Sequence, residues 1–166
     1  MATDQIQKQF LELIQDNAGL IHKVCRLYCH STEDRQDLFQ EILAQLWKAY
    51  SQFRDESKVS TWMYRIALNT AISGFRKQQR RIITVGELPA ESADLQEHGI
   101  LEQKERLAVL QQAVTGLSDI EKAIVMLYLE ERSYQEMEEV LGIGQSSLRV
   151  KMNRIKEKLR RHTGQA

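Results

Sequence analysis

The chain has 166 residues, and its 23 Lys and Arg side chains balance 23 Asp and Glu side chains, so the formal net charge is zero. Apolar residues make up 42% of the chain, as in globular proteins, and the length accommodates one domain or two small ones. No apolar run is long enough to cross a membrane, no apolar signal segment follows Met1, and two cysteines exclude a disulfide scaffold. We therefore expect a cytoplasmic protein that does not insert directly into a membrane.

The zero net charge is a cancellation between segments of opposite sign. Residues 54–81 carry 7 basic and 2 acidic side chains, and residues 145–162 carry 7 basic and 1 acidic. Residues 1–53, 82–102 and 103–144 have net charges of −2, −5 and −4. Because a basic segment is often only a solvated surface, the helix faces that carry the charges decide what they indicate.

The first segment with helical spacing contains both cysteines. His22, Cys25 and Cys29 share one helical face, with His30 just beyond it, and soft ligands at this spacing are able to hold zinc. Apolar residues surround them, however, and cysteine in an apolar helix is more often a small core residue. We therefore favour a buried face and expect neither a metal ion nor another cofactor.

The next predicted helix runs from a cap at residues 31–34 to about Tyr50. Apolar residues at helical spacing form its inner face: Leu38, Phe39, Ile42, Leu43, Leu46, Ala49 and Tyr50. The opposite face is polar and carries Asp37, Gln40, Glu41, Ala44 and Lys48.

A polar loop at residues 51–60 precedes a predicted helix from about Thr61 to Arg80. Its apolar stripe consists of Tyr64, Ala67, Leu68, Ala71 and Phe75. The far side carries Arg65, Asn69, Ser73, Arg76, Lys77 and Arg80, together with Trp62 and Ile66. A tryptophan beside a row of cations is typical of a surface for single-stranded nucleic acid. The alternative, that Trp62 packs under the preceding loop, stays open; the two roles are compatible, and Ile66 fits better with packing.

Residues 82–102 contain the only proline and five acidic residues but no helical periodicity. They are typical of a flexible acidic linker between two helical domains. Beyond them, two S-x-x-E sequences at Ser118 and Ser133 predict capping boxes. The first opens a helix with Ile120, Ile124, Leu127 and Tyr128 on its inner face, and the second opens a short helix with Met137, Val140 and Leu141 inward.

The short helix is predicted to end at Gly142, and a tight turn at residues 143–145 leads to a basic helix from Ser146 or Ser147 to about Arg161. This order is typical of a helix-turn-helix, although any helical hairpin has a similar form. Leu148, Met152, Ile155 and Leu159 lie in a narrow arc of the last helix. The opposite side carries Ser146, Ser147, Arg149, Val150, Lys151, Asn153, Arg154 and Arg161.

Val150 is the informative member of that polar side. An apolar side chain among cations has no reason to be there for packing, but it suits contact with a thymine methyl group in the major groove. A scattered surface valine is the ordinary alternative. The sequence has no zinc-protease, P-loop, dinucleotide-binding or nucleophile-elbow motif, so we do not expect an enzyme.

Three short sequences in the chain form a recognisable set: DLFQE at residues 37–41, TWMYRIALNTA at residues 61–71 and SYQEM at residues 133–137. With them, over about residues 8–162, the chain resembles a bacterial RNA polymerase sigma factor of the extracytoplasmic function (ECF) type, in the sigma-70 family. The three sequences are similar to the family's DLxQE helix, to its TWLxRIAxNxA stretch and to the start of its domain for the −35 promoter element. The resemblance implies an all-α protein with a region 2-like domain (1–81), the acidic linker (82–102) and a four-helix, region 4-like domain (103–166).

The resemblance also implies partners and site residues. Core RNA polymerase, with its β′ and β subunits, would bind Asp37, Gln40, Glu41 and Lys48. The −10 promoter DNA would contact Arg54, Lys58, Trp62, Arg65, Asn69, Arg76, Lys77 and Arg80. The −35 DNA would contact Ser146, Ser147, Arg149, Val150, Lys151, Asn153 and Arg154. Family members are commonly held inactive by an anti-sigma factor.

Two positions depart from the family pattern. The family often has an acid and a bulky residue where this chain has Ser73 and Gly74, and the place of Gly74 beside the apolar stripe suggests close packing. The family favours a small residue facing the recognition helix where this chain has Glu138, which would alter the hairpin or the −35 preference if Glu138 occupies that tight position. The alternatives to a sigma factor are a stand-alone helix-turn-helix regulator and a helical protein-binding adaptor.

Overall fold

The computed structural model describes the backbone of residues 2–82, 108–109 and 111–164, and the same side chains except those of residues 2 and 75–82. Every helix or strand assigned in these ranges is an α-helix, which confirms the predicted all-α class. The chain forms two compact units, Met1–Glu91 and Ser92–Ala166. The division falls within the predicted linker 82–102, which beyond residue 82 lies outside the described residues.

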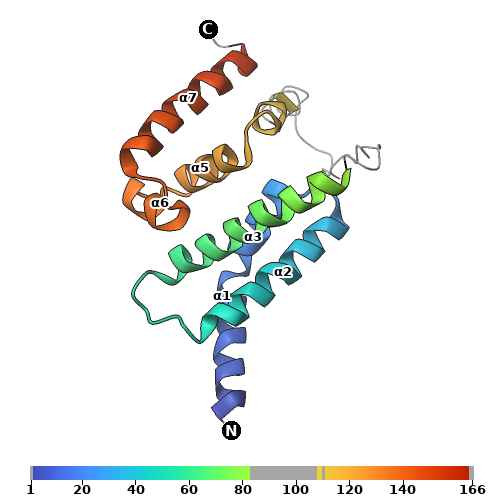
Figure 1. The fold of residues 1–166 in the computed structure, drawn as a ribbon, viewed down its shortest axis with the longest axis vertical. Helices are drawn as coiled ribbons and strands as arrows, with labels where there is room; N and C mark the ends of the chain where they lie inside the picture. The colour runs from blue at the N-terminus through green and yellow to red at the C-terminus, as the bar shows by residue number, and fades with distance from the viewer. Residues whose placement is uncertain (1, 83–107, 110, 165–166) are drawn as a thin grey trace, which may run out of the picture. The chain divides into compact units, whose positions relative to one another are not determined.

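Unit 1 consists of three helices that pack against one another: α1 (Ala2–Tyr28), α2 (Thr32–Tyr50) and α3 (Val59–Ile82) (Figure 1). Each helix contributes an apolar stripe to one shared core, because residues three and four positions apart face the same side. The largest fully buried side chains of this core are Ile21, Val24, Ile42, Leu46, Met63, Tyr64 and Leu68.

The turn between α1 and α2 is held by two side chains. Ser31 caps α2 as predicted, because its hydroxyl accepts a hydrogen bond from the Asp34 N–H at 3.1 Å. The Arg35 Nε donates to the carbonyl oxygen of Cys29 at 3.0 Å, which satisfies a carbonyl at the end of α1. These contacts fix where α2 begins, and the buried Ile42 and Leu46 decide which of its faces points toward the core.

The close packing suggested for Gly74 is wrong. Gly74 is exposed, and no described atom lies within 4 Å of the position that a Cβ atom would occupy. The reason is the position of Gly74 along the helix: Ala71 and Ile72 are the last buried residues among the described side chains of α3, and both Ser73 and Gly74, which follow them, are exposed.

Gly74→Ala is therefore expected to stabilise unit 1 by about 1 kcal/mol, because glycine in a helix interior is disfavoured relative to alanine by about that amount. For a unit of this size the midpoint of thermal unfolding should rise by roughly 4–8 °C, measured by circular dichroism. Ser73→Ala, at the exposed neighbouring position, is the control and should change the midpoint less. A lower midpoint for Gly74→Ala would contradict this account.

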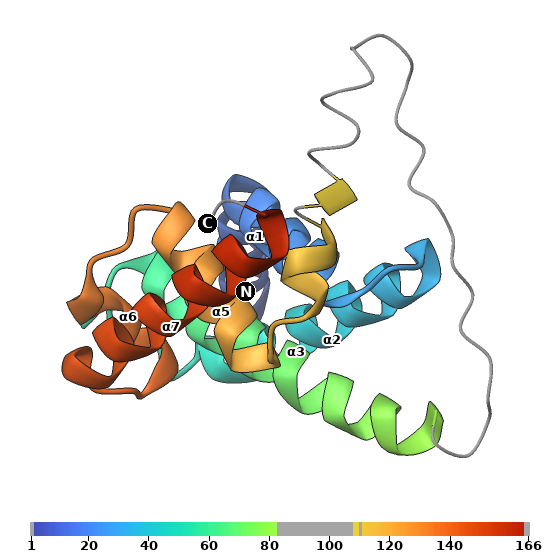
Figure 2. The same ribbon diagram turned by 90° about the horizontal axis from the view of Figure 1, so that it is seen from above.

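Unit 2 contains a helical segment at residues 111–115 and the helices α5 (Asp119–Leu129), α6 (Tyr134–Leu141) and α7 (Gln145–Thr163). α7 packs against both α5 and α6 (Figure 2). Its core is formed by the buried residues Ala113, Leu117, Ile124, Leu127, Met137, Val140, Leu148, Met152 and Ile155.

Both predicted capping boxes are present. The Ser118 and Ser133 hydroxyls accept from the N–H groups of Glu121 and Glu136, and each glutamate accepts from the serine N–H at 2.9 Å. α6 ends as predicted at Gly142, whose φ of 68° is the left-handed conformation that favours glycine. α7 begins at Gln145, slightly earlier than predicted, so the connection between the two helices is tight.

Tyr128 is the one inward prediction for α5 that is wrong. Its side chain is 40% exposed, whereas Ile124 and Leu127 are fully buried. The Lys156 Nζ lies 4.9 Å from the centre of the Tyr128 ring and donates to its hydroxyl at 3.4 Å. The phenol has a polar end that hydrogen-bonds at the surface, which explains why this ring stays at the edge of the core.

Glu121 also connects α5 to α7, and it makes unit 2 sensitive to acid. Partial burial acts to raise the pKa of Glu121, but hydrogen bonds from Lys158 and from the Ser118 N–H lower the pKa below its ordinary value of 4.5. A carboxylate with a depressed pKa stabilises the folded state above its unfolded pKa, and this stabilisation is lost as the pH falls through the folded pKa.

We therefore expect the stability difference between wild type and Glu121→Gln to be constant above about pH 5 and to shrink below it. Glutamine is a suitable replacement because it also completes a capping box. Urea unfolding of both proteins over a pH series measures the difference. A stability difference that does not change with pH would contradict a role for the ionised carboxylate.

Candidate nucleic-acid and protein interfaces

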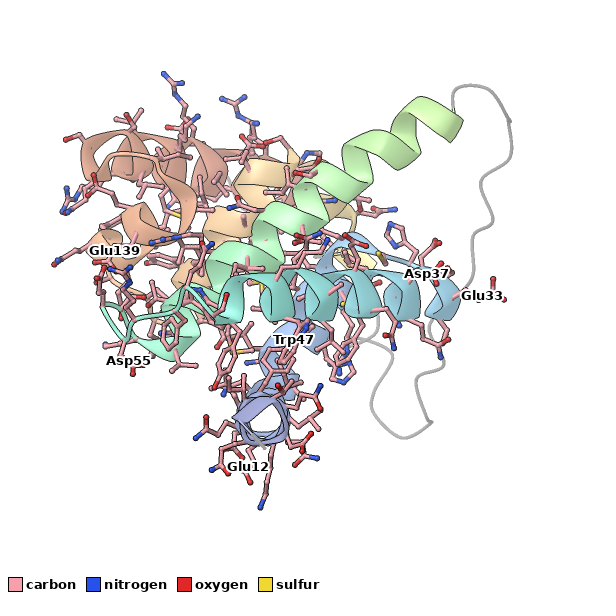
Figure 3. The ribbon with its side chains drawn as sticks, turned by 60° about the horizontal axis from the view of Figure 1, so that its bottom comes forward. Glu12, Glu33, Asp37, Trp47, Asp55 and Glu139 are labelled. Atoms are coloured by element: carbon pink, nitrogen blue, oxygen red, sulfur yellow. The ribbon has the colours of Figure 1, made fainter. Side chains whose placement is uncertain are left out.

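The predicted polar face of α2 lies on the surface of unit 1. Asp37, Gln40, Glu41 and Lys48 are all exposed. The carboxylate of Glu41 accepts a hydrogen bond from the Gln45 Nε2 at 2.8 Å, which holds it along the helix. Figure 3 shows Asp37 beside α2, well separated from Glu12 on α1. Because the opposite face contains the buried Ile42 and Leu46, this side of the helix points away from the core of unit 1.

Trp47 borders this polar face and was absent from the residues predicted for either side of the helix. Its indole is 40% exposed, and its ring meets the Phe10 ring edge-on with centroids 5.0 Å apart (Figure 3). It follows Gln40 by two helical turns, so both lie on the same side of α2. The sequence could have indicated this partial exposure, because Trp47 lies between the polar and apolar arcs of a helical wheel. A partly exposed tryptophan held by a second ring is typical of a residue that contributes strongly to binding a protein.

The predicted −10 DNA residues of unit 1 divide into three groups. Arg54, Lys58, Arg65 and Asn69 are exposed, and the first two lie in the loop before α3. The side chains of Arg76, Lys77 and Arg80 lie outside the described residues. Trp62 is only 8% exposed, and its ring lies 4.7 Å from the Phe53 ring of the loop.

The burial of Trp62 favours the alternative in which it packs under the preceding loop. Stacking of an unpaired base on this ring would require the Phe53 ring to move away from it. The loop carries one strained residue, Asp55, whose φ is 55° (Figure 3). Because Trp62 is buried, the exposed cations Arg54, Lys58 and Arg65 form the accessible part of the predicted −10 DNA surface.

α7 displays all of its predicted −35 DNA residues. Exposed side chains on this helix are Ser146, Ser147, Arg149, Val150, Lys151, Asn153 and Arg154, and Arg161 is exposed near its end. Val150 is 50% exposed, so it is a surface residue among the cations as predicted. Leu148, Met152 and Ile155 are buried on the other side, which fixes the outward direction of the polar face.

The tight position suggested for Glu138 is wrong. Glu138 is exposed, and the residue of α6 that is fully buried is its neighbour, Met137. The carboxylate of Glu138 instead accepts a hydrogen bond from the Nε2 of Gln145, the first residue of α7. A charged residue is tolerated here because it lies at the open edge of the hairpin, where water still reaches it.

Cys25, in α1, and Cys29, directly after the end of α1, are core residues of unit 1. Their exposed fractions are 1% and 9%, and burial raises the pKa of each thiol to about 11. His22, from the same predicted face, stacks on the Phe39 ring of α2 with centroids 4.6 Å apart. No group of three or more potential metal ligands occurs among the described residues. Packing therefore accounts for this face.

Both thiols are accordingly expected to be unreactive in the native protein near neutral pH, because the thiolate is the nucleophile and its population is very small. Reaction with a chromogenic disulfide reagent, measured with and without urea, checks this. Both thiols should react rapidly once the chain is unfolded. Fast reaction of either thiol in the native protein would show that α1 opens locally.

The geometry defines a class of protein. Unit 2 is a helix-turn-helix domain with a cationic outer face on its second helix, and unit 1 presents a separate polar helix face beside exposed cations. A helix-turn-helix with cations on the outer face of its second helix is the arrangement of a DNA-binding protein. None of the described helices is both long and apolar enough to span a membrane.

Comparisons with known proteins make the assignment specific. Residues 13–81 match the family model "Sigma-70 region 2", and residues 107–159 match "Sigma-70, region 4". ECF sigma factor SigW of Bacillus subtilis is 24% identical over 93% of this chain and 89% of its own length. ECF sigma factor SigG of Mycobacterium tuberculosis is 40% identical, but the match covers 42% of this chain and only 19% of that protein.

Solved structures agree on the fold. The sigma factor RpoE of Bartonella quintana, solved in complex with the anti-sigma factor NepR, superimposes with a TM-score of 0.73 at 16% identity over 97% of this chain and 98% of that chain. CnrH, solved with the cytosolic domain of CnrY, gives a TM-score of 0.63 at 18% identity over 92% of this chain and 86% of that chain. This chain belongs to the sigma-70 family, as an ECF-type sigma factor.

Proposed function

We propose that the chain is a transcription initiation factor that binds core RNA polymerase and directs it to promoters with specific −35 and −10 elements. The observation that carries the proposal is that the exposed side chains of α2 and α7 lie in the segments that match sigma-70 regions 2 and 4, in one chain and in that order. A stand-alone helix-turn-helix regulator would leave the polar face of α2 and Trp47 without a partner.

Each unit has a separate task in this mechanism. Asp37, Gln40, Glu41 and Lys48 bind the β′ subunit, and the adjacent Trp47 supplies apolar contact area. α7 lies in the major groove of the −35 element, where arginine and lysine meet base and phosphate acceptors, Asn153 meets base edges and Val150 meets a thymine methyl group. Arg54, Lys58, Arg65 and Asn69 hold the −10 strand as the duplex opens, and Arg76, Lys77 and Arg80 are proposed to add further contacts to the same strand.

The factor itself performs no covalent chemistry. Its contribution is binding free energy: base contacts select the site, and contacts to the unpaired −10 strand favour the open duplex. Because the formal net charge of the chain is zero, sequence-independent attraction of the free protein to DNA should be weak. We therefore expect the complex with polymerase, and not the free protein, to recognise promoters. We expect this to take place in the cytoplasm.

An anti-sigma factor is the proposed regulatory partner. Both structurally similar proteins described above were solved in a complex, one with an anti-sigma factor and the other with the cytosolic domain of CnrY. Such a partner would act by covering the α2 and α7 surfaces, which are the surfaces that polymerase and DNA need.

Purified chain added to core RNA polymerase tests the proposal through promoter-specific run-off transcripts. Transcripts that depend on both the chain and the promoter support it. Tight binding of duplex DNA without transcripts would support the stand-alone regulator instead. If the chain gives no transcripts and does not bind duplex DNA, the result would support a protein-binding adaptor.

A further inference from the structure

Two side-chain contacts connect the outer surfaces of α6 and α7. The guanidinium carbon of Arg149 lies 4.8 Å from the centre of the Tyr134 ring. The Nε2 of Gln145 donates to the Oε2 of Glu138 at 3.1 Å. Tyr134 and Glu138 are four positions apart on α6, and Gln145 and Arg149 are four positions apart on α7, so each pair shares one helix face. One face of α6 thus contacts Gln145 and Arg149 in the first turns of α7, the helix proposed to enter the major groove.

The contact with Glu138 determines what Gln145 offers to DNA. An ionised carboxylate only accepts hydrogen bonds, so the amide must turn its NH₂ group toward Glu138. The amide oxygen then points away from Glu138 and is available as an acceptor. In the major groove, adenine N6 and cytosine N4 are donors, whereas the exocyclic groups of guanine and thymine are acceptors. Gln145 held in this way therefore favours a base that carries an amino group.

The contact with Tyr134 limits where the Arg149 guanidinium lies. Tyr134 is half-buried, so its ring is a fixed surface, whereas Arg149 is an exposed side chain with many accessible rotamers. A guanidinium over a ring keeps its N–H groups available for acceptors beyond the ring edge. Guanine presents two acceptors, O6 and N7, that fit one guanidinium. Because Tyr134 already restrains the Arg149 side chain, Arg149 loses less conformational freedom on binding O6 and N7 of a guanine than an unrestrained arginine would.

We propose that Tyr134 and Glu138 are positioning residues that set the −35 base preference of this protein through Arg149 and Gln145. The inference rests on the proposed function, because it requires α7 to read the −35 element. Neither α6 residue was predicted as a DNA-contacting residue, and neither needs to touch a base. Arg149 is assigned to a guanine, and Gln145 is assigned to an adjacent adenine or cytosine.

The test is transcription by core RNA polymerase with the full chain on a template pool whose −35 region is randomised. A barcode in the transcribed region of each template identifies its −35 sequence, so the sequenced transcripts give the base preference at every position. Tyr134→Leu should lower the preference for guanine at one position by about 2–5-fold, whereas Tyr134→Phe retains the ring and should retain the preference. Glu138→Ala should lower the preference for adenine or cytosine at another position by about 2–10-fold, and Glu138→Gln should lower it as well, because its amide can also donate and no longer fixes which way the Gln145 amide turns.

Matched controls separate positioning from stability and from charge. Glu139→Ala removes the same charge from the neighbouring exposed position of α6, and Tyr128→Leu removes the ring under Lys156 further along α7. Both controls should leave the base preference unchanged, and circular dichroism confirms that every variant is folded.

Three results would overturn the inference. An unchanged preference would show that the contacts do not act on DNA reading. A uniform loss over all −35 sequences would show that they support phosphate binding or the fold instead. If wild-type protein gives no promoter-specific transcripts at all, the proposed function fails and this inference fails with it, which distinguishes that case from the other two.

Discussion

Reversing the charge of Asp37 is expected to reduce the affinity for core RNA polymerase by at least about tenfold. Asp37 is an exposed carboxylate of α2. In the proposed complex it would face opposite charge on the polymerase, and like charges brought together at an interface cost several kcal/mol. A loss of about 1.4 kcal/mol already corresponds to tenfold in affinity. Asp37→Arg should leave the fold intact, because the residue lies beyond the first turn that Ser31 caps.

Binding of labelled protein to core enzyme, titrated at constant ionic strength, measures this effect. Glu12→Arg is the matched control, since it makes the same change at an exposed position of α1 away from the α2 face (Figure 3). The control should bind core enzyme like wild type. If both variants bind equally weakly, the effect comes from net charge and not from the α2 face. If both bind normally, the partner surface lies elsewhere on unit 1.

Arg154→Ala is expected to lower transcription from promoters that depend on the −35 element by about 5- to 150-fold, since one good arginine–base contact contributes about 1–3 kcal/mol of discrimination. Core binding should be unaffected, because Arg154 lies on the exposed face of α7 in unit 2. Competitive run-off transcription on promoters with and without the −35 element measures the effect.

Arg160→Ala is the control for Arg154→Ala. It removes the same charge from the last turn of the same helix, at an exposed position outside the predicted −35 set. Arg160→Ala should have a much smaller effect on −35-dependent transcription. Joint loss of core binding and transcription in Arg154→Ala would mean that this arginine supports the fold or the polymerase contact.

The two predictions are complementary because they address different units of one chain. Asp37 variants should fail before DNA is engaged, whereas Arg154 variants should form the polymerase complex and then misread the promoter. A protein that used only its helix-turn-helix would be insensitive to the Asp37 change. The pair of measurements therefore tests the division of tasks between the units as well as the individual residues.

Much of the fold followed from local chemistry. The caps at Ser31, Ser118 and Ser133 and the end of α6 at Gly142 were predictable because a cap involves side chains within three or four residues of the bond they satisfy. The outward face of α7 was predictable because Leu148, Met152 and Ile155 recur at helical spacing.

The predictions that were wrong or incomplete concern residues at the edges of the faces. Trp47, Tyr128, Gly74 and Glu138 all lie where a helical wheel changes from apolar to polar, so periodicity alone does not decide their environment. Trp62 belonged to a cationic arc by its angle, yet it is buried because the Phe53 loop covers it.

The sequence by itself determined the helices, their caps, the two basic faces and the family motifs, because these depend on neighbours along the chain. Only the tertiary structure decided which edge residues are exposed and which side chains meet across helices, since that depends on how helices distant in sequence pack. The clearest case is α6 and α7: their residues were each visible in the sequence, but the contacts Tyr134–Arg149 and Glu138–Gln145 exist only because a tight turn brings the two helices together.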